Sequence, residues 1–257
     1  MNKKERYQHF LDYFSKNAPD AVTELHYDNP FQLLIAVILS AQCTDKRINQ
    51  VTPPLFERFP TPQALAASTS EEVFEYIRSV SYPNNKAKHL VGMAKMLTEV
   101  FHGEVPSDLD ELQKMPGVGR KTANVIASVV FDAPAIAVDT HVFRVANRLG
   151  LTNNAKTPLA VEKQLVANLP KDVRGIAHHW LILHGRYICL ARSPKCEICP
   201  LNWFCRYYER NNTETALLKA EALKARNVKA AKKKKTLDKM TKNRIRIKSD
   251  QGTHIIS

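Results

Sequence analysis

The sequence predicts an all-α protein of about ten helices, and three observations support this fold class. Apolar residues recur at spacings of three and four, as in segment 4–17, where Tyr7, Phe10 and Phe14 form one stripe. Serine, aspartate or proline stands at the start of several such segments, where helices commonly begin. No segment alternates convincingly between apolar and polar residues, and the nearest case, 133–139, is short.

The expected helices follow in chain order after 4–17. Segment 30–42 opens on Pro30 and is apolar on nearly every side, which predicts a buried helix. Segment 70–80 begins with Ser70 as its N-cap, followed by acidic residues. Segment 85–101 is amphipathic. The remaining expected helices cover 107–115, 120–131, 139–150, 157–169 and 171–189.

The charge of the chain is high and uneven. Its 257 residues suit one large domain or two modest ones, and the formal net charge of +13 favours a polyanionic partner. Residues 211–257 hold 13 Lys and Arg against 4 Asp and Glu, which leaves +4 for residues 1–210. Because the basic segment has few apolar residues, the sequence predicts a folded body over 1–210 and a basic, disordered tail over 211–257.

The stretch MPGVGRKT, residues 115–122, has the small and basic residues of a phosphate-binding turn. A nucleotide P-loop does not fit, because Lys121 stands one position late after Gly119 and Lys114 occupies the place of the first glycine. A tight connection between two helices is one interpretation of the glycines. The other is a hairpin whose backbone N–H groups bind a DNA phosphate at the start of the second helix.

Lys121 would lie in the first turn of the helix after the hairpin. The helix dipole and partial desolvation in a cleft both lower the pKa of an ammonium group there. A lysine with a lowered pKa can act as a nucleophile and form a Schiff base. Asp139 follows an apolar run and precedes an amphipathic segment, which suits an N-cap or a carboxylate beside a developing positive charge. Both roles are compatible, because capping uses one carboxylate oxygen.

Four of the five cysteines lie within 17 residues and have the spacing C-x6-C-x2-C-x5-C. Metal ligation is favoured over disulfides, since no secretory signal is visible. Only one cysteine pair has the close spacing of a zinc knuckle, so an iron–sulfur cluster is favoured, with zinc as the alternative. Cys43 stands far from the others and is expected to pack in the core.

Five segments of the chain occur in one order: LLIAVILSAQCTD, MPGVGRKTANV, AVDTHVFRV, HHWLILHGRYIC and the cysteine motif. Together they resemble the endonuclease III family of helix–hairpin–helix DNA glycosylases, over about residues 1–208. The resemblance implies a two-lobed helical DNA glycosylase fold with a helix–hairpin–helix motif and a C-terminal iron–sulfur loop. The central lobe would cover about 22–133, with the hairpin at 108–132. The N-terminal segment and 134–210 would form the second lobe, with the cluster loop at 189–205.

The resemblance also implies roles for individual residues. Lys121 would attack C1′ of the damaged nucleotide and Asp139 would assist that step. The cysteines of the motif would hold a [4Fe–4S] cluster, and they are Cys189, Cys196, Cys199 and Cys205. DNA contacts would come from the hairpin, from the positions that enter the duplex around a flipped base, and from the start of the helix after Asp139. These residues are Gly117, Val118, Gly119, Gln42, Tyr82 and His141.

The implied activity is that of a bifunctional DNA glycosylase and abasic-site lyase in base excision repair. Such an enzyme removes oxidised pyrimidines from double-stranded DNA, acts on abasic sites, and cuts the strand by β-elimination. A cytoplasmic, nucleoid-associated monomer without membrane association is expected, since no apolar run is long enough to cross a bilayer.

Two alternatives stay open at this stage. A monofunctional mismatch glycosylase of the same superfamily generally lacks the hairpin lysine. A non-catalytic DNA-binding module with a structural metal loop has no need for Lys121 and Asp139 together.

Overall fold

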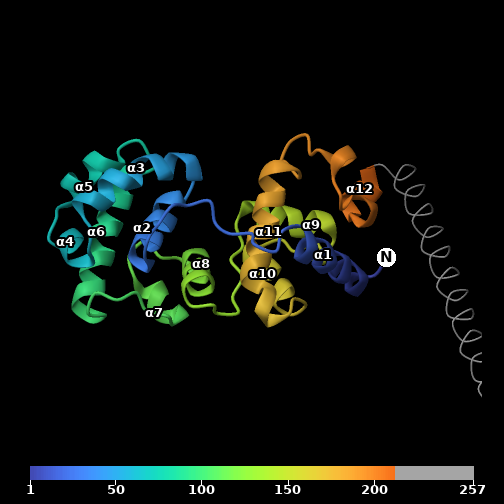
Figure 1. The fold of residues 1–257 in the computed structure, drawn as a ribbon, viewed down its shortest axis with the longest axis horizontal. Coiled ribbons are helices and arrows are strands. Elements are labelled where there is room, and N and C mark those ends of the chain that lie inside the picture. The colour runs from blue at the N-terminus through green and yellow to red at the C-terminus, as the bar shows by residue number, and fades with distance from the viewer. Residues whose placement is uncertain (212–257) are drawn as a thin grey trace, which may run out of the picture. The chain divides into compact units, whose positions relative to one another are not determined.

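The computed structural model describes residues 1–211, and this part of the chain is helical, without a strand (Figure 1). Its α-helices are α1 (Lys3–Asn17), α2 (Pro30–Ser40), α3 (Asp45–Arg58), α4 (Pro62–Ala66), α5 (Ser70–Ile77), α6 (Pro83–Val100), α7 (Leu109–Lys114), α8 (Arg120–Val130), α9 (Thr140–Leu149), α10 (Pro158–Val166), α11 (Arg174–Tyr187) and α12 (Arg206–Asn211). The predicted all-α class is confirmed. The expected tail lies, apart from its first residue, outside the described residues.

The chain divides into two units, Met1–Ile198 and Cys199–Ser257. In the described part of the second unit, the 3-10 turn Asn202–Phe204 packs against α12. The domain boundaries expected from the sequence stay a prediction. No helix of residues 1–211 is both long and apolar enough to cross a membrane.

One group of helices in the first unit consists of α2 to α8 and has the apolar helix α2 at its centre. Eight of the eleven residues of α2 are buried, and α2 packs against α3, α6 and α8 (Figure 1). Pro30 at the first position and the Asn29 side chain, which accepts from the N–H of Gln32, set its start. Cys43 packs against this core, as expected.

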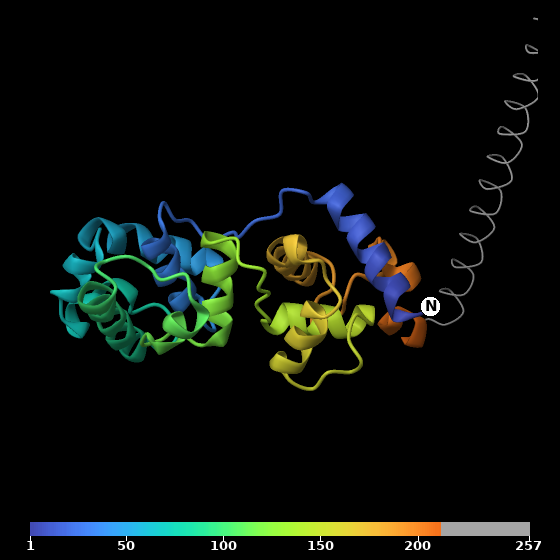
Figure 2. The same cartoon turned by 90° about the horizontal axis from the view of Figure 1, so that it is seen from below.

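The other group consists of α1 and α9 to α11, and chain segments 18–29 and 131–139 connect it to the first (Figure 2). Trp180 of α11 stacks on Phe14 of α1 with ring centroids 5.5 Å apart. The indole N–H of Trp180 donates to Ala18 O at 2.7 Å. The stripe predicted on segment 4–17 is therefore the face of α1 that packs on α11.

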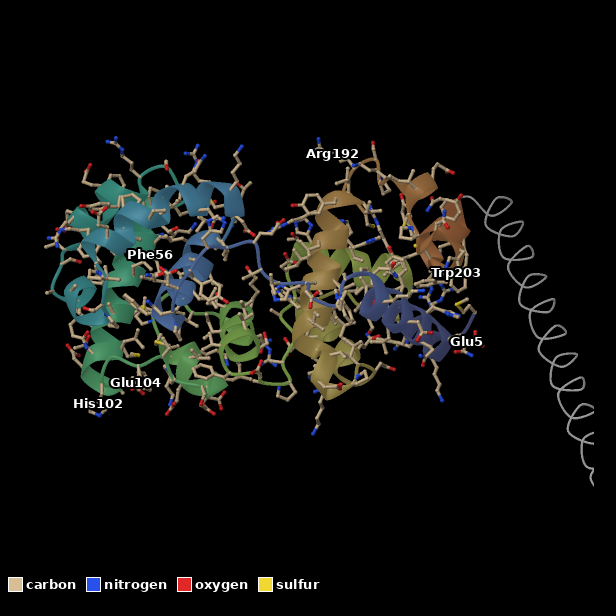
Figure 3. The ribbon with its side chains drawn as sticks, in the orientation of Figure 1. Glu5, Phe56, His102, Glu104, Arg192 and Trp203 are labelled. Atoms are coloured by element: carbon tan, nitrogen blue, oxygen red, sulfur yellow. The ribbon has the colours of Figure 1, made fainter. Side chains whose placement is uncertain are left out.

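The N-terminus of α1 has a reciprocal capping box that the sequence analysis did not single out. The Asn2 side chain accepts from the N–H of Glu5, and the Glu5 side chain, labelled in Figure 3, accepts from the N–H of Asn2. The box fixes the point at which the chain enters α1.

Three helices, α3, α4 and α12, were not predicted, and one predicted cap was wrong. Pro53 and Pro54 lie inside α3, where proline normally breaks a helix. The helix continues because its buried face, which includes Ile48 and Leu55, packs against the core. At α5 the N-cap is Thr69, whose hydroxyl accepts from the N–H of Glu72, and the expected cap Ser70 is the first residue of the helix.

Candidate active site

The hairpin that joins α7 to α8 consists of residues 115–119. Gly117 has φ +80°, and a Cβ at this position would lie 2.9 Å from His89 Cβ of α6. Both the backbone conformation and the close approach therefore require glycine here. Gly119 has φ −87° and is the N-cap of α8, with open space where a Cβ would stand. Its small size leaves the start of α8 accessible.

The N-terminus of α8 is open to an incoming anion. Within the described part of the chain no side chain caps it, and Gly119, Arg120 and Lys121 are all exposed. Uncapped N–H groups and the helix dipole favour a negatively charged ligand such as a phosphate. Val118 differs from its neighbours, because its side chain is buried and its N–H donates to Met115 O at 3.0 Å. The predicted phosphate contact of Val118 would therefore not come from its N–H.

Asp139 caps the next helix, α9. Its Oδ1 accepts from the N–H of Val142 at 2.7 Å, which is the capping role predicted from the sequence. Within residues 1–211 its Oδ2 makes no hydrogen bond. The cap therefore fixes the carboxylate and leaves one oxygen available at the site.

Lys121 and Asp139 line one small cavity, of about 50 Å³, together with Asp45, His178 and Arg186. Burial lowers the pKa of Lys121 and Arg186 acts in the same direction, whereas Asp139 and Asp45 raise it. The net pKa of the ammonium group is lowered. Much of the side chain is nevertheless exposed, because the cavity opens to solvent. A substrate can reach a lysine that gives up its proton more readily than usual.

Arg186 holds the acids at the rim of this cavity. Its Nη2 lies 2.7 Å from Asp45 Oδ2 at the start of α3, and its Nη1 pairs with Glu24 in the segment between α1 and α2. The hydroxyl of Tyr187 also donates to Glu24. This set of contacts connects α11 with the segment that leads into the α2–α8 group, on either side of Lys121.

His178 supports the segment that carries Asp139. Its Nδ1 lies 2.8 Å from Ala137 O, and because a carbonyl oxygen only accepts, Nδ1 carries the proton. Burial lowers the pKa of His178 to about 3, so the ring is neutral at ordinary pH.

His141 follows Asp139 in the first turn of α9 and has a local partner. Its Nδ1 lies 3.1 Å from Arg144 Nη2, and burial lowers the pKa of the half-buried ring. Arg144 also donates to Gly185 O at 3.0 Å and to Cys189 O at 3.1 Å. The guanidinium therefore fastens α9 to α11, and the DNA contact expected of His141 stays a prediction.

Gln42 and Tyr82 lie on adjacent loops. Both are exposed, and both have φ +56°, in the left-handed region that bulky residues seldom adopt. The hydroxyl of Ser81 donates to Gln42 O at 2.7 Å and joins the two loops. The structure thus brings together the two residues predicted to enter the duplex, although neither lines the cavity around Lys121.

The first two cysteines of the motif belong to the first unit, and Cys199 and Cys205 belong to the second. Cys189 Sγ lies 3.4 Å from Arg148 Nη1. Burial raises the pKa of Cys196, and the neighbouring Cys189 raises it further. Two close thiols beside a guanidinium suit the ligation of an anionic thiolate cluster, whose sulfur atoms accept such hydrogen bonds.

Known proteins that resemble this chain share its motifs and its fold. Residues 35–171 match the HhH-GPD superfamily of base excision DNA repair proteins, and residues 189–205 match the iron–sulfur binding domain of endonuclease III. Endonuclease III of Rickettsia conorii is 49% identical over 198 residues, which are 77% of this chain and 94% of the relative. The chain belongs to the endonuclease III family.

Further similarities agree with this membership. Endonuclease III of Bacillus subtilis is 50% identical over 196 residues, which are 76% of this chain and 90% of the relative. A solved structure of a trapped covalent intermediate of endonuclease III with DNA has a TM-score of 0.78 and 50% identity, and the match covers 82% of this chain and 99% of that chain.

Membership of the endonuclease III family confirms several predictions. The fold is the two-lobed helical glycosylase fold, and the protein is a DNA glycosylase and abasic-site lyase of base excision repair. The iron–sulfur cofactor, a [4Fe–4S] cluster, is confirmed at the level of the family. The monofunctional and non-catalytic alternatives are not favoured.

Sequence reasoning missed the part that Arg186 and Glu24 play in the site of this endonuclease III relative. Arg186 lies inside the motif HHWLILHGRYIC, yet nothing in that motif indicates a partner. Its two partners are more than 100 residues away in sequence, and only the packing of α11 brings them together. Asp45, the first residue of α3, lines the same cavity as Asp139 and pairs with Arg186.

Proposed function

We propose that Lys121 is the nucleophile of this enzyme. The observation that carries the proposal is that an accessible lysine with a lowered pKa shares a cavity with a fixed carboxylate, Asp139. The neutral amine attacks C1′ of a nucleotide flipped out of the duplex, and the bond from C1′ to the base breaks. The nitrogen gives up a proton, the C1′–O4′ bond breaks with protonation of O4′, and nitrogen and C1′ form an iminium in the opened sugar. Loss of a proton from C2′ follows, and the 3′ phosphate leaves by β-elimination.

Asp139 stabilises the positive charge that develops at the sugar. The cap at Val142 holds the carboxylate in place, and its Oδ2 is the atom available to the reacting centre. A fixed charge of this kind stabilises a transition state without reorganisation during the reaction. Asp139 Oδ2 is also the acceptor best placed by this cap to take a proton from the attacking amine.

The substrates are oxidised pyrimidines and abasic sites in double-stranded DNA. The uncapped start of α8 binds a backbone phosphate through Gly119 and its neighbours, while Gln42 and Tyr82 enter the duplex beside the flipped nucleotide. Gly117 and Val118 shape the hairpin, and His141 in the first turn of α9 is a further DNA contact. The enzyme acts as a monomer, in the cytoplasm and at the nucleoid.

The cluster is held by Cys189, Cys196, Cys199 and Cys205. When bound, it supplies four metal–thiolate bonds that fix the loop after α11. Arg148 and Arg144 support Cys189 from α9 through its sulfur and its carbonyl oxygen. Iron and inorganic sulfide in the purified protein, lost when two of the cysteines are replaced by serine, would support this assignment; zinc in place of iron would contradict it.

Borohydride trapping tests the nucleophile. We expect a covalent complex between the wild-type protein and a duplex with one abasic site, because borohydride reduces the iminium to a stable amine. Lys121→Ala should abolish the complex, whereas Lys95→Ala, an exposed lysine on α6, should leave it unchanged. Absence of a trapped complex with the wild type, or its persistence in Lys121→Ala, would refute the proposal.

A further inference from the structure

A buried lysine at the start of α6 holds the end of α2. Lys86 is only 6% exposed, and its Nζ donates to Leu39 O at 2.8 Å and to Ala41 O at 2.7 Å. Helix α2 ends at Ser40, and the carbonyl groups of a last helical turn lack partners within the helix. A cation at this negative end of the helix dipole is stabilised. Lys86 is therefore the C-terminal cap of α2, supplied by another helix.

Lys86 has no carboxylate partner among residues 1–211. Burial lowers the pKa of its ammonium group, and the nearby Cys43 acts in the opposite direction. A buried ammonium that pairs only with carbonyl oxygens is a costly way to end a helix. The contacts that this cap makes lie at the end of α2, directly before the loop of Gln42.

The same residue also fixes the second loop. The backbone N–H of Lys86 donates to Tyr82 O at 3.1 Å and closes the first turn of α6. Its side chain reaches Ala41, the residue before Gln42, while Ser81 bonds to Gln42 directly. Left-handed backbone at two large residues persists only where the surroundings enforce it. Here the Lys86 side chain holds the residues before Gln42, its backbone N–H bonds to Tyr82, and Ser81 links the two loops.

We propose that Lys86 is a positioning residue that holds the loops of Gln42 and Tyr82 as one preformed probe, which enters the duplex when a damaged base is extruded. The inference rests on the proposed function of those two residues. Lys86 does not line the cavity of Lys121, although Ser40, between its two acceptor residues, does. Its loss should therefore slow extrusion of a stacked base more than the chemistry at C1′. An abasic nucleotide has no base to unstack, so its processing should depend less on the probe.

The test compares two reactions of the full chain under single-turnover conditions. One duplex carries thymine glycol, an oxidised pyrimidine, opposite 2-aminopurine, whose fluorescence reports loss of stacking of the opposite base, and the other carries a preformed abasic site. In Lys86→Met we expect base excision to fall by about tenfold or more, as for other misplaced positioning groups. Strand cleavage at the abasic site should change by less than about threefold, and the fluorescence rise should be smaller.

Two further variants serve as references. Lys86→Arg keeps a cationic donor and should recover most of the excision rate. Lys95→Met makes the same chemical change at an exposed site of α6 and should behave as the wild type. If Lys86→Met does not fold, as judged by circular dichroism, Ser81→Ala removes the direct link between the loops. Ser81→Ala should also reduce base excision more than strand cleavage at the abasic site, but by a smaller factor than Lys86→Met.

Equal losses in both reactions, or no loss in either, would overturn the inference. An unchanged fluorescence rise in Lys86→Met would do the same. These results differ from failure of the proposed function, in which the wild-type protein itself would neither excise thymine glycol nor form a trapped complex.

Discussion

Helices α8 and α9 begin at the same cavity, but their N-termini differ, because only one of them is capped by a side chain. Helix α8 starts at Gly119, which has no side chain to cap it, and Lys121 projects from its first turn. Helix α9 starts at Asp139, whose carboxylate accepts from the N–H of Val142. The first terminus leaves its N–H groups for a ligand, whereas the second is satisfied from within the protein.

This difference indicates that each helix terminus interacts with a charge of a different sign, an anionic phosphate at α8 and a cationic sugar at α9. An uncapped terminus attracts an anion and disfavours an ammonium, so it can bind a phosphate and lower the pKa of Lys121 at the same time. The capped terminus holds an anion of its own, which can face a cationic sugar. A cap added to α8 should therefore weaken DNA binding, and loss of the charged cap of α9 should slow the chemistry.

The largest effect is expected from removal of the charge at α9. Asp139→Asn keeps a good N-cap, so the free energy of unfolding should change by less than about 0.5 kcal/mol. The rate of base excision should nevertheless fall by about 10²- to 10³-fold, because the charge facing the sugar is lost. Single-turnover kinetics and thermal unfolding measure the two quantities.

Asp139→Ala is the matched variant for this test. It should lose a similar rate and in addition about 1 kcal/mol of stability, because the cap is gone as well. If Asp139→Asn excised bases at the wild-type rate, capping would be the whole function of this residue.

A smaller effect is expected when α8 receives a cap. Gly119 has open space around its missing Cβ and an ordinary φ, so Gly119→Asp fits without strain. The variant should gain a few tenths of a kcal/mol in stability. Its affinity for DNA should fall by about tenfold, because a carboxylate now occupies the phosphate position.

Gly119→Asn is the uncharged control, and its loss of affinity should be smaller than that of Gly119→Asp. Fluorescence anisotropy at two salt concentrations separates the two variants, since only for the charged variant should the loss of affinity relative to the wild type become smaller as salt is added. Tighter binding by Gly119→Asp would contradict a phosphate site at this helix.

The two helix termini also show what could be learned from the sequence. Gly117, Gly119, Lys121 and Asp139 occur in short motifs whose local structure follows from neighbours in the chain, so the turn and the Asp139 cap could be predicted. Where a local rule and packing disagree, packing decides, as at α3, which continues through two internal prolines that normally break a helix.

Contacts between distant segments could not be predicted. The pairs of Arg186 with Asp45 and Glu24 each join residues more than 100 positions apart, and Lys86 caps a helix that ends 46 positions before it. A single sequence carries no period or spacing for such contacts. Their partners become evident only from the fold.

Because Arg186 lowers the pKa of Lys121, removal of Arg186 should shift the pH dependence of the reaction rate. Lys121 attacks as the neutral amine, so the rate rises as pH passes through its pKa. Arg186 lowers this pKa, while Asp139 and Asp45 raise it. Removal of the guanidinium in Arg186→Met should therefore raise the pKa and move the rising limb of the profile to higher pH.

Asp45→Asn should move the same limb in the opposite direction, because it removes a group that raises the pKa. The profiles follow from trapping rates between about pH 5 and 9. Arg58→Met serves as a control, since Arg58 pairs with Glu72 at 2.5 Å on the surface. Shifts of the same sign in the Arg186 and Asp45 variants would contradict this electrostatic account.

The smallest effect on chemistry is expected from the basic segment 212–257, which lies outside the described residues. Its 13 Lys and Arg against 4 Asp and Glu should add affinity for DNA that is independent of sequence and weakens steeply with salt. A chain without this segment should bind more weakly at low salt, with a shallower dependence of log Kd on log salt concentration. At high salt the affinities of the two chains should converge, and at saturating protein the yield of trapped complex should be equal.

The loss of affinity caused by Gly119→Asp should persist in the shortened chain, because the start of α8 holds a positioned phosphate whereas the segment supplies only diffuse charge. Equal salt dependence of the two chains would show that the excess charge of this protein does not act on DNA.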